Sequence, residues 1–396
     1  MPSIHVSKTQ IPIRFRMTFF TSVTTSLLFT IGLSGCTQSL ENRAETTQEK
    51  ATQEETVQIE EVVDGLDHPW SMVFLPEGGM LITERPGAIR HLNGSNELSD
   101  PLEGLPEVYA YGQGGMLDLA LPDDYRESGW VYISFSEPNE KGEACTALGR
   151  ARFDGERFND FEVIFRQEPK IDEPNHFGGR IAFRGGFVYL MMGERFQFDP
   201  AQDLTNHLGT IVRLNPDGSI PADNPFLNIE RALPEIWSYG HRNIEATAID
   251  PQTGNLWIAE MGPKGGDELN LIKKGENYGW PEVSWGMHYD GELIPDPPTR
   301  PEFADAAIHW TPVISPSGMD FYTGDLFPQW KNHMLIGGLS ATGVVIVEVN
   351  GEQANEVDRI DLKARTREVK QGSDGAIYAL TDSNNGKLLK IIPGGK

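Results

Sequence analysis

A short unit of two apolar strands joined by a turn recurs along this chain, and the repetition permits few folds. In each unit an apolar run is followed by a turn rich in Pro, Asp or Gly and then by a second apolar or alternating run. Six units can be read, at residues 71–84, 117–134, 180–191, 246–259, 318–337 and 368–380. A small antiparallel unit repeated between long loops is typical of a β-propeller, where radial closure protects the strand edges. The repeats predict an all-β fold, a six-bladed β-propeller with four-stranded antiparallel blades.

The chain also carries strand candidates outside the six units. Residues 57–63 precede the first unit, and residues 387–392 follow the last one. Pairing of these two segments in one blade would close the ring, so residues 56–394 are expected to form a single catalytic domain. The 42 Gly and 27 Pro residues fall between short apolar runs, which makes helix the minority element. Irregular spacing of the units leaves a β-sandwich open as an alternative.

The first 35 residues read as a secretory signal. Lys8, Arg14 and Arg16 form a basic start, and residues 17–33 are uncharged and largely apolar. The stretch ends with small residues before Cys36, which resembles the lipobox of bacterial lipoproteins, where the cysteine is acylated. Its several Thr and Ser residues argue against the alternative, a plain transmembrane anchor. We expect residues 1–35 to be a lipoprotein signal peptide and Cys36 to be lipidated.

Residues 36–55 are polar, without aromatic residues or apolar periodicity, and are expected to be a disordered tether. Thr37 differs from the aspartate that retains lipoproteins at the inner membrane. The expected product is therefore an exported bacterial lipoprotein at the periplasmic face, anchored to the outer membrane through its lipid alone.

Charge and cysteine content exclude other classes. Removing residues 1–35 deletes three basic and no acidic residues, which changes the formal net charge from −25 to −28. Such acidity argues against nucleic-acid partners. With Cys36 lipidated, Cys145 has no disulfide partner and is expected to be a buried apolar residue.

One polar cluster precedes the third unit. His176 lies in the segment Asn-His-Phe-Gly-Gly-Arg at residues 175–180, where the glycines would let a flat ligand approach the backbone. A histidine suits general-base work because its pKa lies near working pH. Glu194 ends the paired strand and could orient the imidazole. The alternatives are a histidine that caps a turn and an ion pair of Glu194 with Arg195 or Arg213.

Three arginines lie in segments that follow or precede strands. Arg242 belongs to the donor-rich segment 239–243, and it could bind an anion or stabilise a developing oxyanion. Arg365 and Arg367 are two residues apart, a spacing that puts both guanidinium groups on one face of a strand. Such a pair suits a polycarboxylate or a phosphate. Surface ion pairs are the alternative for all three.

A glycine-rich acidic segment occupies residues 260–268 and is followed by Asn-Tyr-Gly-Trp-Pro at residues 277–281. Glycines free backbone carbonyls to turn inward beside carboxylates, which suits Ca²⁺. EF-hand spacing is absent from the sequence, and no Cys/His cluster favours zinc.

Together these motifs resemble the PQQ-dependent soluble aldose sugar dehydrogenases, a family related to soluble glucose dehydrogenase. The similarity covers nearly the whole mature domain and is carried by residues 65–70, 111–118, 175–180, 213–218, 262–268, 277–281 and 317–319. It implies a six-bladed propeller with PQQ over the channel mouth. It also implies oxidation of aldoses at the anomeric carbon to lactones, with electrons passed to an external quinone or cytochrome, by a monomer or homodimer.

The resemblance further implies roles for single residues. His176 would take the proton of the anomeric hydroxyl, Glu194 would orient it, and Arg242 would lie near the reactive quinone carbonyl. The other residues implied as PQQ contacts are Gln113, Asn243, Tyr289, Arg365 and Arg367. The residues implied in calcium binding are Gly262 and Pro263 through backbone oxygens, and Glu268 and Tyr278, which resemble ligands of a calcium in the same region.

The chain departs from the family pattern at several positions. Ile244-Glu245-Ala246 stands where relatives commonly have Pro-Gln-Gly, and Ser340 stands where relatives often place a lysine or arginine. Met261 replaces a polar residue of glucose-specific relatives. Two other functions remain open at this point. One is a calcium-dependent propeller lactonase, which would not require Arg242, Arg365 and Arg367; the other is a non-catalytic propeller binding protein that has lost its cofactor.

Overall fold

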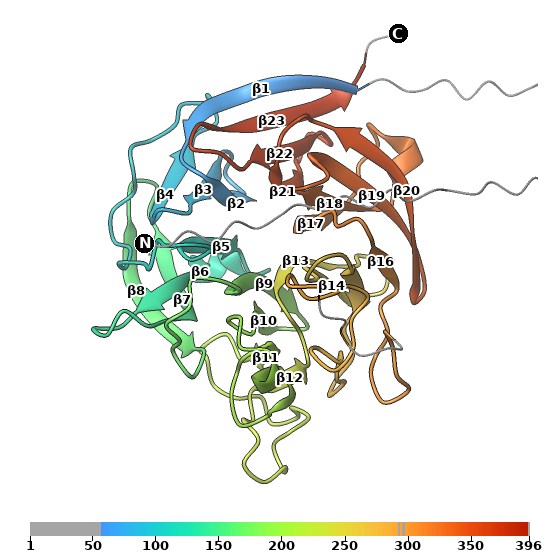
Figure 1. Ribbon diagram of the computed structural model, residues 1–396. Coiled ribbons are helices and arrows are strands. Elements are labelled where there is room, and N and C mark those ends of the chain that lie inside the picture. The colour runs from blue at the N-terminus through green and yellow to red at the C-terminus, as the bar shows by residue number, and fades with distance from the viewer. Residues whose placement is uncertain (1–56, 292–293, 295–297, 395–396) are drawn as a thin grey trace, which may run out of the picture. The chain divides into compact units, whose positions relative to one another are not determined.

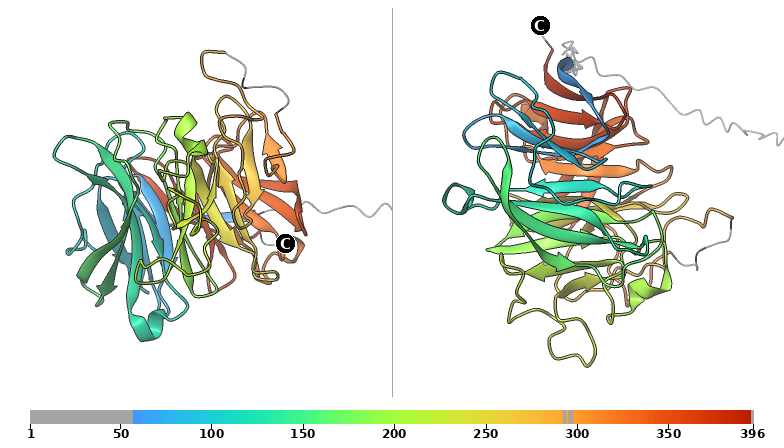
Figure 2. Two further views of the ribbon diagram at one scale, coloured as in Figure 1. Left: turned by 90° about the horizontal axis from the view of Figure 1, so that it is seen from below. Right: turned by 90° about the vertical axis from the view of Figure 1, so that its left-hand side faces the viewer.

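The computed structural model describes residues 57–291, 294 and 298–394, which form six antiparallel sheets arranged around a common centre (Figure 1). The predicted six-bladed propeller is confirmed. Views from the side show twisted sheets packed face to face around the ring (Figure 2). The predicted signal peptide, Cys36 and the tether lie outside the described residues.

The blades follow one another along the chain. The first contains β2 (Pro69–Phe74), β3 (Met80–Glu84) and β4 (Ala88–Leu92). The second contains β5 (Met116–Ala120), β6 (Trp130–Pro138), β7 (Ala144–Phe153) and β8 (Phe158–Arg166). The third contains β9 (Gly178–Arg184), β10 (Phe187–Met192), β11 (Thr210–Leu214) and β12 (Ile236–Tyr239).

The remaining blades have the same antiparallel order. The fourth contains β13 (Ile244–Ile249), β14 (Leu256–Glu260), β15 (Asp267–Leu271) and β16 (Ile308–Trp310). The fifth contains β17 (Pro316–Phe321), β18 (Met334–Gly338), β19 (Gly343–Asn350) and β20 (Gln353–Asp361). The sixth contains β21 (Thr366–Gln371), β22 (Ile377–Thr381), β23 (Gly386–Pro393) and β1 (Val57–Leu66).

The first blade has three strands where four were predicted. A loop takes the place of its fourth strand: the N–H groups of Ser99 and Leu102 donate to the carbonyls of His91 and Ile89 on β4. Pro101 lies between these two donors and has no N–H of its own. The contact therefore stays too irregular to form a strand.

The six predicted units are the two inner strands of each blade. These strands are buried almost throughout, as in β14, where all five residues are buried. Outer strands such as β20 are mostly exposed. Burial on both faces explains why most inner strands are apolar enough to be recognised in the sequence, whereas most outer strands are not.

The ends of the described chain meet in the sixth blade. β1 pairs antiparallel with β23, with Ile59 opposite Ile391 and Glu60 opposite Lys390 (Figure 1). The predicted pairing of residues 57–63 with 387–392 is thus confirmed. At the end of β1, Leu66 is fully buried with apolar residues of the first and sixth blades, among them Met72, Ile82, Leu380 and Leu388.

Apolar clusters hold the blades together. Each blade-to-blade interface has a cluster of its own; one contains Trp257 and Leu269 of the fourth blade with Met319 and Met334 of the fifth. Within the described part of the chain, helix is limited to α1 (Tyr125–Ser128) and two short 3₁₀ segments. Among the described residues, no helix has the length and apolar character needed to cross a membrane.

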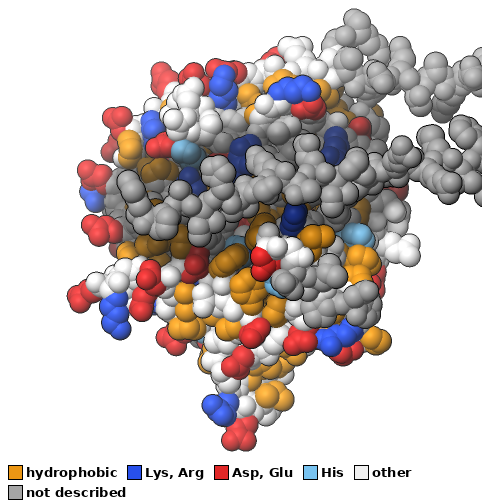
Figure 3. All heavy atoms as spheres, viewed as in Figure 1, with side chains coloured by type: hydrophobic (Ala, Val, Ile, Leu, Met, Phe, Trp, Pro, Cys, Tyr) orange, Lys and Arg blue, Asp and Glu red, His pale blue; other side chains and the backbone are white. Residues whose placement is uncertain are grey.

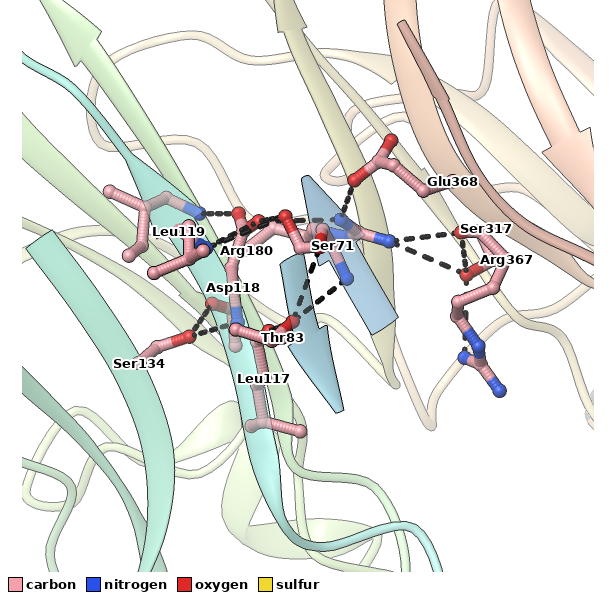
Figure 4. Close-up of polar contacts among 12 residues, drawn as sticks. Ser71, Thr83, Leu117, Asp118, Leu119, Ser134, Arg180, Ser317, Arg367 and Glu368 are labelled. Atoms are coloured by element: carbon pink, nitrogen blue, oxygen red, sulfur yellow. Dashed lines mark hydrogen bonds and ion pairs between the residues drawn. The ribbon is translucent and has the colours of Figure 1, made fainter. Parts of the chain in front are cut away.

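A buried polar network occupies the centre, where β2, β5, β9, β13, β17 and β21 meet in a ring. Arg180 of β9 lies at the middle of this network (Figure 4). Its Nη1 is 2.5 Å from Oε2 of Glu368 on β21 and 3.4 Å from Oδ1 of Asp118 on β5. Asp118 in turn accepts hydrogen bonds from Ser71 Oγ of β2 and from the N–H of Ile181. One arginine therefore links inner strands from several blades.

Candidate active site

Two adjacent cavities collect most of the predicted site residues. The first, here the histidine cavity, has a volume of about 530 Å³ and the second, the arginine cavity, about 390 Å³. The histidine cavity is lined among others by His176, Arg242, Gly262, Pro263, Asp267 and Tyr289. The arginine cavity is lined among others by Trp70, Glu245, Leu339, Arg365, Arg367 and Asp382. Gln113, Met261 and Ser315 line both, so the two cavities share a wall.

His176 reaches the cavity from a strained turn just before β9. Its φ is +53°, and Gly178 and Gly179 follow with φ of +64° and +113°, values that glycine adopts readily. The approach of the next strand is also close: a Cβ at Gly193 would lie 2.2 Å from the carbonyl oxygen of His176. The His-Phe-Gly-Gly motif therefore positions the imidazole through backbone geometry.

Glu194 contacts His176 as predicted. Oε1 of Glu194 lies 2.9 Å from Nδ1 of the imidazole, and Oε2 accepts the N–H of Gln197 at 2.7 Å. The alternative ion pairs of Glu194 with Arg195 or Arg213 do not form, because Arg195 donates to backbone carbonyls and Arg213 pairs with Asp223. An ionised carboxylate only accepts hydrogen bonds, so Nδ1 carries the proton and Nε2 is left as the basic nitrogen.

Burial keeps this imidazole neutral. The side chain is 6% exposed, and burial lowers the pKa of His176 below its usual value. Glu194 acts in the opposite direction through its hydrogen bond, while the positive charge of Arg242 adds to the lowering. A neutral imidazole with one fixed N–H is the form that accepts a proton at Nε2.

Two predicted cofactor contacts brace the histidine turn. The N–H of His176 donates to Oε1 of Gln113 at 2.7 Å, and Gln113 also lines both cavities. Asn243 is fully buried; its Oδ1 accepts the N–H of Gly178 at 3.1 Å and its Nδ2 donates to Glu245 at 3.0 Å. Asn243 lines neither cavity, so its amide is committed to the protein.

Arg242 lines the histidine cavity and also another, smaller cavity that contains Glu260 and Glu268. Its Nη1 donates to the carbonyls of Met261 and Gly262, both at 2.9 Å. Its Nε and Nη2 are buried and have no partner among the described residues. The guanidinium also lies over the ring of Trp280 at 5.2 Å. Buried N–H groups without acceptors are expensive, so these two nitrogens suit an anionic or carbonyl ligand.

Arg365 and Arg367 meet on one side of the arginine cavity, as their spacing predicted. Both donate through Nη2 to Oδ2 of Asp382, at 3.2 and 2.9 Å. The side chain of Arg365 is 53% exposed, whereas that of Arg367 is 10% exposed and its Nε has no partner among the described residues. Arg367 also contacts Glu245, with 3.2 Å between Nη1 and Oε2.

A small third space, the carboxylate cavity, lies beside Arg242 and contains Glu260 and Glu268. Its volume is about 20 Å³, enough for a single ion or water. Glu268 is half-buried, and desolvation together with the charge of Glu260 raises its pKa to about 8. The phenol of Tyr278 points elsewhere: it donates to the carbonyl of Leu271 and accepts the N–H of Lys273. Only the main-chain oxygen of Tyr278 remains for a cation.

Asp267 holds the loop that carries Gly262 and Pro263. Its Oδ1 accepts the N–H of Gly262 at 2.9 Å and its Oδ2 accepts the N–H of Ser315 at 2.6 Å. Burial raises the pKa of this carboxyl to about 6. The loop is tight, since a Cβ at Gly262 would lie 2.3 Å from the carbonyl oxygen of Gly266. The acidic segment was recognised in the sequence, but the bracing role of Asp267 was not.

The loop between β15 and β16 supplies the outer wall. Tyr289 lines the histidine cavity, is 64% exposed, and has its ring 5.9 Å from the guanidinium carbon of Arg242. Part of this loop stands out from one face of the ring (Figure 2). On the face seen in Figure 3, Lys and Arg side chains lie near the middle, and Asp and Glu predominate at the periphery. This pattern fits an anionic ligand near the centre of an acidic protein.

No three His, Cys, Asp or Glu side chains converge as a metal site within residues 57–291, 294 and 298–394. Any metal at these cavities would therefore need main-chain oxygens or a ligand of its own. Cys145 is buried, as predicted, and burial raises the pKa of its thiol to about 11.

Comparison with known proteins gives consistent matches. A family model described as glucose/sorbosone dehydrogenase matches residues 66–390. The aldose sugar dehydrogenase YliI of Escherichia coli is 44% identical over 348 residues, which cover 85% of this chain and 93% of the relative.

Solved structures agree with the sequence relatives. The apo-form of the soluble aldose sugar dehydrogenase of Escherichia coli superposes with a TM-score of 0.83 at 43% identity, covering 86% of this chain and all of the other. The PQQ-bound aldose sugar dehydrogenase of Streptomyces coelicolor superposes with a TM-score of 0.70 at 27% identity, covering 85% and 99% of the two chains.

Proposed function

The chain belongs to the glucose/sorbosone dehydrogenase family, and from this premise we propose that it oxidises aldose sugars at the anomeric carbon to lactones with PQQ and Ca²⁺. Electrons would pass to an external acceptor, a quinone or a cytochrome. The observation that carries the proposal is that His176, hydrogen-bonded to Glu194, lines the same cavity as Arg242, whose Nε and Nη2 have no partner among the described residues.

The residues fit PQQ as a ligand. PQQ is flat and carries three carboxylates, and two adjoining cavities offer Arg242 on one side and Arg365 and Arg367 on the other. The buried N–H groups of Arg242 and Arg367 that lack partners among the described residues match a ligand rich in acceptors. When bound, PQQ supplies a quinone that accepts hydride from the sugar.

His176 would act as the general base. Its Nε2 would take the proton of the anomeric hydroxyl, while Glu194 holds the Nδ1 proton and stabilises the imidazolium that forms. Burial keeps the imidazole in its neutral form before the transfer. Met261, Met287 and Tyr289 would exclude water on the outer side of the histidine cavity.

The loop and the carboxylate cavity fit calcium. Backbone oxygens of Gly262 and Pro263 would hold the ion beside PQQ, and Glu268 with the main-chain oxygen of Tyr278 would hold a calcium in the neighbouring space. Glu260 and Glu268 line the same small space, and desolvation together with the nearby charge of Glu260 raises the pKa of Glu268. A divalent ion would relieve this repulsion.

The position in the cell forms a separate part of the proposal. Lipidation of Cys36 after removal of residues 1–35 would anchor the propeller at the periplasmic side of the outer membrane through residues 36–55. Labelling with a radioactive fatty acid tests this: the wild-type chain should incorporate label and a Cys36→Ala variant should not. Equal labelling of the two chains would refute the anchor.

Reconstitution tests the enzymatic proposal. Purified apo-protein receives PQQ and Ca²⁺ and is assayed for reduction of an artificial electron acceptor with several aldoses, with a chelator-treated sample as control. We expect turnover that needs both additions. If no aldose is oxidised and lactones are hydrolysed with metal alone, the function is that of a lactonase and the proposal fails.

A further inference from the structure

Glu245 is a carboxylate inside a cavity that otherwise suits an anion. Its side chain is 6% exposed and lines the arginine cavity. Oε2 lies 3.2 Å from Nη1 of Arg367, and Oε1 accepts Nδ2–H of Asn243 at 3.0 Å. The side chain therefore points toward the guanidinium that an anionic ligand would use.

Two carboxylates already form ion pairs with the guanidinium of Arg367. Asp382 approaches its Nη2 at 2.9 Å, and Glu245 approaches its Nη1. Asp382 is shared with Arg365 and is fixed by its own N–H, which donates to the carbonyl of Arg365. Among the residues that the structure describes, one cation lies within ion-pair distance of the Glu245 carboxylate, and that cation is Arg367. The bond between Glu245 and Arg367 is thus the one that a ligand carboxylate can replace.

The surroundings of Glu245 make an additional negative charge unfavourable. Arg180 donates to its carbonyl oxygen at 2.7 Å and, with Arg367, favours the ionised carboxylate, whereas burial and Asp382 disfavour it. Burial is the larger influence and raises the pKa of Glu245. A ligand carboxylate placed on Arg367 would add like charge within a few ångströms of this group.

This inference rests on the proposed PQQ-dependent function. We propose that Glu245 competes with the carboxylates of the cofactor for Arg367, so that this residue sets how tightly the apo-protein binds PQQ. A positioning role for Glu245 makes the opposite prediction, because a carboxylate that only orients Arg367 toward the ligand would strengthen binding. The sign of the effect therefore separates the two roles.

The experiment measures PQQ affinity of the apo-protein at saturating Ca²⁺ by calorimetry, independent of turnover. Glu245→Gln keeps the length of the side chain and its acceptor for Asn243 but removes the charge. We expect it to bind PQQ about tenfold more tightly than the wild type, a change that corresponds to about 1.4 kcal/mol. Glu156→Gln, which removes an exposed charge on the hairpin between β7 and β8, is the matched control and should bind like the wild type.

A second variant covers the possibility that Glu245→Gln fails to fold, as judged by its melting curve. Glu245→Asp keeps the charge but withdraws it from Arg367 by one methylene, and we expect binding tighter than in the wild type. Affinity equal to or weaker than that of the wild type in the folded variant would overturn the competing role and leave the proposed function intact. If neither the wild type nor the variants bind PQQ, the proposed function fails with it.

Discussion

His176 combines a neutral imidazole with a carboxylate on its far nitrogen, and this combination defines it at the residue scale. Burial lowers the pKa of the ring, and Glu194 at 2.9 Å limits that effect and fixes which nitrogen carries the proton. The imidazole does not hold in place any of the groups that are proposed to bind the cofactor. Its removal should therefore affect proton transfer and leave cofactor binding intact.

The first prediction follows from that separation. His176→Ala should lower kcat by about 10² to 10⁴ while the affinity for PQQ stays within a factor of two of the wild type. Steady-state kinetics and calorimetric titration measure the two quantities. His333→Ala, a histidine of the fifth blade away from both cavities, serves as control. Loss of PQQ binding in His176→Ala would show that the imidazole holds the cofactor and is not the base.

The second prediction concerns pH. The base must be neutral, and its pKa in the folded protein lies below the usual 6.5. The value of kcat/KM should therefore rise as pH increases through this lowered pKa and level off above it. In Glu194→Gln the group that raises the pKa is gone, so the acidic limb should move to lower pH. A limb centred above pH 6.5 would contradict a buried neutral base.

The sequence predicted some of these residues but not the contacts that they make. It located His176, Glu194 and the three arginines because their types and spacing carry chemistry. It could not find the contact between Glu245 and Arg367, because the two are separated by 122 positions and only the ring brings β13 and β21 together. It also could not tell that the amide of Asn243 and the phenol of Tyr278 are used within the protein.

At the scale of elements, the two inner strands of each blade were predictable, and of the other strands only β1 and β23 were predicted. Most inner strands are buried and rich in apolar residues, whereas an outer strand such as β20 is largely exposed and reads as ordinary polar sequence. The missing fourth strand of the first blade was not foreseen either, because it depends on Pro101, which interrupts the backbone hydrogen bonds of the loop beside β4.

The third prediction tests the strand that closes the ring. Leu66→Ala at the buried end of β1 should reduce the free energy of unfolding by about 2–5 kcal/mol, because it opens a cavity between the first and sixth blades. Ile59→Ala on the exposed part of the same strand should change it by less than about 0.5 kcal/mol. Urea unfolding followed by circular dichroism measures both. Equal effects would mean that β1 adds pairing without packing.

At the scale of the whole molecule, Arg180 connects the polar network at the centre of the propeller to the arginine cavity. Besides Asp118 and Glu368, it donates to the carbonyls of Glu245 and Arg367, and its guanidinium lies 3.9 Å from the ring centre of Trp70. The floor of the arginine cavity and the inner strands of the propeller therefore share one buried cation.

The fourth prediction concerns this cation. Arg180→Met leaves buried carboxylates unpaired, and it should reduce the free energy of unfolding by about 3–5 kcal/mol. Arg157→Met, which removes an exposed pair with Glu103, should change it by at most about 1 kcal/mol. Chemical unfolding measures the two variants side by side. A loss for Arg180→Met no larger than for Arg157→Met would show that the central network is not a source of stability.

The pairing of β1 with β23 also has a consequence for biosynthesis. Of the described strands, β1 leaves the ribosome first and its partner β23 leaves last. The ring cannot close until β23 has been synthesised and has paired with β1. Until then, the edge of β22 that β23 will cover stays unpaired. We therefore expect the growing polypeptide to remain incompletely folded, and accessible to chaperones, for nearly the whole time of its synthesis.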